Sequence, residues 1–234
     1  DIVLLDDLTE FHVDRVWIKG VLTAEGGEYL LPVERYDSSA VAGSIRFKDF
    51  SVEKLKMGLK SGHVHVIEIQ PGGVVTKKSV ADVPLDDKGE FIWSKDLDIA
   101  KVAVVERHQL TGNVACGFLK GYGIQHGAIA LSIAHDSHNV IVVGVSDEEM
   151  AFAVEKLKEQ GGGIVLTQEG QVIDAMPMPI AGLMSDRSGQ WVAEKLESIH
   201  EEAYTKLGIH REVEPVMTLC FMSLAVIPEI KLTD

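Results

Sequence analysis

The stretch AIALSIAHDSHNVIVVG, residues 128–144, places two largely apolar segments on either side of a short polar insert. The segments at residues 128–134 and 140–145 are shorter than a typical helix and are bounded by polar or glycine residues, so both are predicted as strands. A third apolar run, residues 100–105, is continuous enough to predict a strand that is buried on both faces. A sheet with a covered core is therefore the centre of the predicted fold.

More strands are predicted on either side of this core. They occupy residues 63–69, 114–119, 164–167 and 172–175, and the last two form a hairpin that turns at Glu169-Gly170. The first of them, HVHVIEI, alternates strictly, which is typical of a strand with one exposed face. The sheet is therefore expected to be large.

Helices are predicted mainly in the second half of the chain. Ser146 and Glu149 stand at the N-cap and N3 positions of a capping box, and an apolar stripe at helical spacing follows them. A second helix is expected over residues 189–207 and a short one over residues 51–59. Strands outnumber helices, so the predicted class is α+β (mixed α/β), with helices packed on a largely antiparallel sheet.

The N-terminal region has a different pattern. Residues 1–31 contain short apolar runs separated by turn signals, as in a small β layer, and Pro32 opens an irregular stretch. A boundary is therefore placed between residues 31 and 32, with the main domain over residues 32–234. Because Asp1 leads directly into the apolar run Ile2–Leu5, the chain is expected to be the later part of a longer protein.

Composition excludes several classes of partner. The chain has 234 residues and a formal net charge of -14, and no cluster of Lys and Arg that could bind nucleic acid or an anionic membrane. No apolar run reaches the ~18 residues of a membrane span, and the first residues lack the basic region of a signal peptide. Cys116 and Cys220 stand in apolar contexts, which predicts free thiols in a reducing compartment, the cytoplasm.

Two polar groups are candidates for chemistry. The insert His135-Asp136-Ser137-His138-Asn139 can ligate a metal, shuttle protons or bind a polar ligand; its alternative is a hydrogen-bonded turn. Glu106-Arg107-His108 ends the buried strand, where functional residues often lie; its alternative is a solvated strand end. His63 and His65 are assigned to the exposed face of their strand rather than to a metal site. The segment 177–186, PMPIAGLMSD, is interpreted as a packed loop.

The runs VVERHQLTGNVACGFLKGYGIQHGAIALSIAHDSHNVIVVG, GGGIVL, PIAGLMSD and MTLCFMSLAVIPEIKLTD, in this order, resemble the C-terminal domain of bacterial and archaeal adenine deaminases, in the amidohydrolase superfamily. The resemblance is close over residues 100–234 and looser before them. It implies a hydrolase of purine salvage that converts adenine to hypoxanthine and ammonia. It also implies a (β/α)₈ barrel before Asp1 that binds two manganese or iron ions, and it makes residues 1–31 a β-sandwich segment following that barrel.

On this basis the polar groups are expected to close or support the barrel's active site. His135, Asp136 and His138 are the catalytic candidates for lining the pocket or relaying protons, and the expected substrate-binding candidates are Glu106, Arg107, His108 and Asn139. No catalytic metal ligand is expected in this chain. The expected partners are adenine, the barrel of the same protein and further copies in a homo-oligomer.

Two other interpretations stay open. In one, the region is a non-catalytic assembly domain and its histidines are structural. In the other, it is an autonomous hydrolase that binds its own metal through His108, His135 and His138. A separate barrel chain that accompanies this one is a variant of the main hypothesis.

Overall fold

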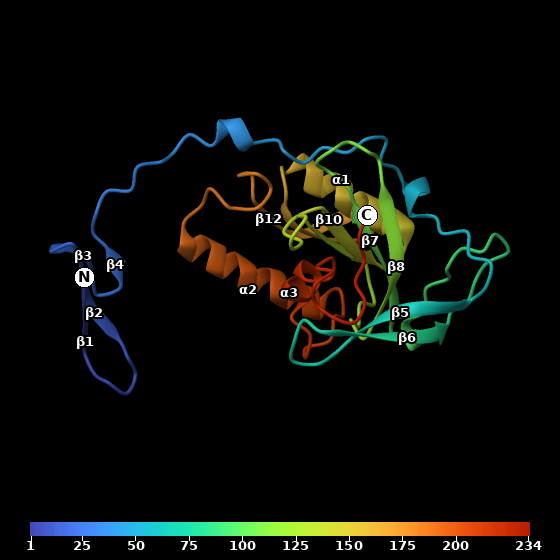
Figure 1. Ribbon diagram of the computed structural model, residues 1–234, viewed down its shortest axis with the longest axis horizontal. Helices are drawn as coiled ribbons and strands as arrows, with labels where there is room; N and C mark the ends of the chain where they lie inside the picture. The colour runs from blue at the N-terminus through green and yellow to red at the C-terminus, as the bar shows by residue number, and fades with distance from the viewer. The chain divides into compact units, whose positions relative to one another are not determined.

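A computed structural model describes all residues, 1–234, and divides them into two compact units, Asp1–Ser38 and Ser39–Asp234 (Figure 1). None of its helices combines the length and the apolar character needed to span a membrane.

The first unit is a single antiparallel sheet without helices. Its strands follow the chain order and are β1 (Ile2–Leu5), β2 (Val13–Ile18), β3 (Val21–Glu25) and β4 (Glu28–Tyr29). Directly opposite residues share a face, so Ile2 and its partner Trp17 lie on one face and Val3 and Val16 on the other. Ile2 is 64% exposed and Val3 55%. Apolar side chains are therefore exposed on both faces of this small sheet.

The second unit is built on an eight-stranded sheet in the order β12-β11-β9-β10-β7-β8-β5-β6. All neighbouring strands are antiparallel except the short parallel pairing of β5 with β8. The strands are β5 (His63–Ile69), β6 (Thr76–Asp82), β7 (Ile99–Val105), β8 (Val114–Lys120), β9 (Ala128–Leu131), β10 (Val140–Gly144), β11 (Gly163–Gln168) and β12 (Gln171–Pro177). The prediction of a largely antiparallel α+β fold is confirmed.

Helices cover both faces of this sheet (Figure 1). They are α1 (Asp147–Glu159), α2 (Gly189–Thr205) and α3 (Pro215–Cys220), with short 3-10 helices η1 (Ser39–Val41), η2 (Val52–Leu55) and η3 (Lys95–Leu97). Alternate side chains of β7 point to opposite faces. Ala103 and Val105 pack in one apolar cluster with the buried side of α1, whereas Val102 and Val104 pack in another with residues of α2 and α3. Every residue of β7 is buried, as predicted.

Local hydrogen bonds explain where the predicted boundaries differ. β9 ends at Leu131 rather than residue 134. Ser132 N still donates to Gly163 O (3.0 Å), but Gly163 N donates to the Ser132 hydroxyl (2.8 Å) and not to a backbone carbonyl of the ladder. Ser146 caps α1 by accepting from Glu149 N at 3.2 Å, but the Glu149 carboxylate accepts from Gly170 N at 2.7 Å instead of closing the capping box. The helix predicted over residues 51–59 is wrong beyond the four residues of η2.

Candidate functional site

The two predicted polar groups meet at one end of the sheet. β7 and β10 are antiparallel, and Val105 at the end of β7 pairs with Val140 at the start of β10. The residues that follow β7 therefore lie beside those that precede β10. With residues 180–184 they form what we call the polar loop end, defined as residues 106–111, 134–139 and 180–184.

Glu106 organises the first of these loops. It is 3% exposed, and its carboxylate accepts from the backbone N of His108 (2.5 Å), Gln109 (2.6 Å) and Thr111 (2.9 Å) and from Thr111 Oγ1 (3.0 Å). Burial raises the pKa of this carboxyl, but the hydrogen bonds outweigh burial and lower the pKa to about 2. The four donors occupy the acceptor sites of an ionised carboxylate, so Glu106 folds its own loop.

Arg107 is 2% exposed and joins three segments of the chain. Its Nε donates to His138 O (2.6 Å), one terminal nitrogen donates to Ser44 O (3.3 Å) and the other donates to Ala181 O (3.2 Å). Its backbone N donates to Asn139 Oδ1 (3.3 Å). The solvated strand end considered for this motif is therefore wrong for Glu106 and Arg107, and it describes only His108, which is exposed.

The polar insert is a tight turn. His138 N donates to Ala134 O at 2.6 Å, and His138 adopts a left-handed backbone conformation with φ 52°. Asn139 is buried, and its Nδ2 donates to Asp234 Oδ1 at 3.0 Å. The hydrogen-bonded turn considered as an alternative is therefore present, but Asp136 is exposed and takes no part in holding it.

Two histidines lie on this turn, which we call the histidine turn (residues 134–139), and His108 lies beside it. The rings of His135 and His138 are in edge contact with centroids 5.5 Å apart, and His135 also packs on Phe221 at 4.8 Å. His108 Nε2 is 2.7 Å from Ser137 O. His138 Nδ1 is buried and has no hydrogen-bond partner. Burial first, then the neighbouring His135 and Arg107, lower the pKa of His138, which favours the neutral imidazole.

This arrangement can exchange a proton or bind a polar group, but it does not form a metal centre. His135 is half-buried and His108 and Asp136 are exposed, so these three side chains are accessible at the polar loop end. No group of three or more His, Cys, Asp or Glu side chains in residues 1–234 is arranged to hold a metal ion. His63 and His65 lie on the exposed face of β5, as predicted.

The loop that follows β12 completes the polar loop end. Ser132 Oγ donates to Gly182 O at 2.5 Å and Ala181 N donates to Val41 O at 3.1 Å. Gly182 has φ +72°, and a Cβ added there would lie 2.6 Å from Ile45 Cδ1. The prediction of a packed loop at residues 177–186 is therefore confirmed, and the Arg107 contact to Ala181 O links this loop to the histidine turn.

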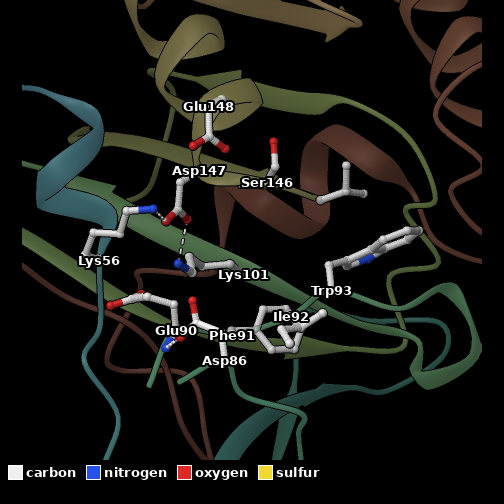
Figure 2. Close-up of a pocket in the computed structure, with 11 residues that line it drawn as sticks. Lys56, Asp86, Glu90, Phe91, Ile92, Trp93, Lys101, Ser146, Asp147 and Glu148 are labelled. Atoms are coloured by element: carbon white, nitrogen blue, oxygen red, sulfur yellow. Dashed lines mark hydrogen bonds and ion pairs between the residues drawn. The ribbon is translucent and has the colours of Figure 1, made fainter. Parts of the chain in front are cut away.

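Sequence reasoning missed a buried charge at the other end of β7. Lys101, read as part of an apolar run, is 4% exposed and lines a cavity of about 360 Å³ (Figure 2). Figure 2 shows Asp147, the first residue of α1, between Lys101 (2.5 Å) and Lys56 (3.1 Å). Lys101 Nζ also donates to Leu55 O at 3.0 Å. The Asp147 carboxylate pairs with both ammonium groups, and these contacts join α1, β7 and η2. A lysine inside an apolar run was the available signal.

Comparisons with known proteins agree on one family. The family model described as "Adenine deaminase C-terminal domain" matches residues 73–234. "Adenine deaminase 2" of Desulfotalea psychrophila is 59% identical and "Adenine deaminase 2" of Carboxydothermus hydrogenoformans is 47% identical, each over 234 residues, which cover 100% of this chain and 41% of the relative. "Adenine deaminase" of Ligilactobacillus salivarius is 42% identical, with 100% and 40% covered. The chain thus spans about two fifths of the length of these relatives.

Proposed function

The chain belongs to the adenine deaminase C-terminal domain family, and from this premise we propose that it is the C-terminal part of an adenine deaminase. Such an enzyme hydrolyses adenine to hypoxanthine and ammonia, a reaction of purine salvage in the cytoplasm. The match over residues 73–234 and the names of the relatives support this proposal. Since the chain covers about two fifths of each relative, the active site is assigned to the part of the enzyme outside these residues.

The polar loop end closes or supports that active site. The observation that carries this assignment is the meeting of His108, His135 and His138 at one end of the sheet, with His138 Nδ1 buried and unpartnered. A neutral imidazole can accept or donate a proton near pH 7. His135, Asp136 and His138 are the proposed pocket or proton-relay residues, and a covering domain would also keep bulk water from the substrate.

The substrate-binding candidates now differ in how they can act. His108 is exposed and can reach adenine directly. Arg107 and Asn139 are buried and bonded to the turn, and Glu106 is saturated by its own loop, so these three would act by holding the loops in place.

The metal of the reaction is assigned to the same outside part. The residues of this chain do not fit a binuclear site, because no group of His, Cys, Asp or Glu side chains is arranged for it. The expected pair of manganese or iron ions therefore belongs to the barrel of the proposal, and an autonomous metal-dependent hydrolase gains no support.

The first unit supports docking to further polypeptide. A four-stranded sheet with apolar side chains exposed on both faces leaves apolar surface that a neighbouring polypeptide can cover. Ile2, Val3 and Phe11 are each more than half exposed. The barrel of the same protein and a second copy in a homo-oligomer are the proposed neighbours. The same feature favours the alternative of an assembly domain, in which the histidines have no part in the chemistry.

The test uses the complete protein with His135→Ala and His138→Ala, and with His65→Ala as a matched control on the exposed face of β5. Loss of a proton-relay or pocket residue is expected to lower kcat for ammonia release from adenine about 100-fold or more. Metal content and oligomer size should stay unchanged, and the control should match the wild type. Wild-type kinetics with an altered oligomer size would favour the assembly domain. Wild-type kinetics and metal content in both variants would reject the active-site role.

A further inference from the structure

Arg107 is unusual because its charge is buried without an anion. Its guanidinium contacts oxygens of Ser44, His138 and Ala181, which are backbone carbonyls and one hydroxyl, and it forms no ion pair with a carboxylate. Buried charges are ordinarily paired, because removing them from water is unfavourable. Each nitrogen of the guanidinium is instead directed at an oxygen of another chain segment, which indicates a geometric task for this residue.

That task is evident in the contact with His138. The 2.6 Å bond from Arg107 Nε to His138 O holds the peptide after His138, and the 2.6 Å bond from His138 N to Ala134 O holds the peptide before it. Between these two bonds His138 has φ 52°, a left-handed backbone conformation that is uncommon for residues other than glycine. The backbone conformation of a residue limits the rotamers of its side chain, so fixing the backbone of His138 limits the directions of its imidazole.

We propose that Arg107 is a positioning residue, which acts through the backbone of His138 to aim its imidazole and locks the histidine turn to the loops at Ser44 and Ala181. This inference rests on the proposed function of the polar loop end. The groups that influence His138 are His135, Arg107, Asp136 and His108. Among them Arg107 supplies a permanent positive charge, which disfavours protonation of the ring.

The planar fork of arginine suits this task. Its Nε and two terminal nitrogens donate in fixed directions, and here those directions meet three chain segments. A lysine has one compact ammonium group and cannot reproduce these directions, although it retains the charge. Arg107→Lys therefore tests geometry, and Arg107→Gln tests geometry and charge together.

The experiment compares both variants with Arg187→Gln, a matched change at an exposed arginine, in the complete protein. Hydrogen exchange by mass spectrometry should speed up at least 10-fold in residues 134–139 of Arg107→Lys and remain unchanged in Arg187→Gln. In Arg107→Gln the fall of kcat at acid pH should begin at a higher pH than in the wild type, because the permanent positive charge beside His138 is lost. KM should change little. The double variant Arg107→Lys/His138→Ala should be no slower than His138→Ala alone, because Arg107 acts through His138.

The outcomes separate the two proposals. If His138→Ala turns over like the wild type, the proposed function fails for His138, and the exchange rates of residues 134–139 still decide whether Arg107 positions the turn. Unchanged exchange in a folded Arg107→Lys protein, or losses that simply add in the double variant, would overturn the positioning role. If Arg107→Gln does not fold, the Arg107→Lys results decide.

Discussion

Replacing Glu106 by glutamine is expected to destabilise the protein in a pH-dependent way. The carboxylate accepts three backbone N–H groups and one hydroxyl within 3.0 Å, and its pKa is lowered from 4.5 to about 2. A shift of that size corresponds to about 3 kcal/mol of folding free energy near pH 7. A glutamine NH₂ cannot accept these bonds and would face two of the donors. We therefore expect Glu106→Gln to lower the free energy of unfolding by about 3 kcal/mol at pH 7.

The sign of the pH effect follows from the lowered pKa. A carboxyl whose pKa is lower in the folded state stabilises the fold above its unfolded pKa of 4.5, and this stabilisation is lost as pH falls toward about 2. At pH 3 the wild type should have lost about 2 kcal/mol of this contribution, so the gap to Glu106→Gln should narrow by the same amount. Urea unfolding followed by circular dichroism at pH 7 and pH 3 measures both differences. A difference in unfolding free energy below about 1 kcal/mol at pH 7, or one that does not narrow at pH 3, would show that the Glu106 carboxylate does not stabilise the fold through these bonds.

Two further changes test contacts within the second unit. Asp147→Asn should lower the free energy of unfolding by about 3 kcal/mol, because it leaves the Lys101 ammonium, 4% exposed, without its carboxylate; urea unfolding within 1 kcal/mol of the wild type would contradict this. Gly182→Ala should lower the midpoint of thermal unfolding more than Gly170→Ala, because both glycines have positive φ but only Gly182 has a neighbour within 4 Å of an added Cβ. Equal midpoints for the two variants would show that the close contact is unimportant.

The strands and helices that were predicted are those with a strong local signal. The apolar runs of β7 and β10 identify buried strands because no polar position interrupts them except Lys101. Ser146 locates the start of α1 because its hydroxyl is needed to accept a helix N–H. In contrast, no strand was predicted over β6, because its sequence, TKKSVAD, is largely polar. As an edge strand with a solvent-facing side it needs little apolar surface, and its lysines discourage pairing with other chains.

The candidate site was predicted in parts but not as a whole. The sequence identifies two polar groups at strand ends, but only the pairing of β7 with β10 shows that they lie side by side. The partners of Arg107 at Ser44 and Ala181 are separated from it by 63 and 74 residues. They present backbone carbonyls, which every residue has. No sequence pattern marks such contacts. The hydrogen bonds by which Arg107 holds the backbone of His138 and the loops at Ser44 and Ala181 could therefore be found only in the structure.

The central claim is that the histidine turn takes part in the chemistry of a larger deaminase. The most direct measurement is the initial rate of ammonia release from saturating adenine by the complete protein that carries both His135→Ala and His138→Ala, with its metal content determined on the same sample. If the turn takes part in the reaction, the rate should be at least about 100-fold below that of the wild type, at an unchanged metal content. A rate equal to that of the wild type would contradict this claim.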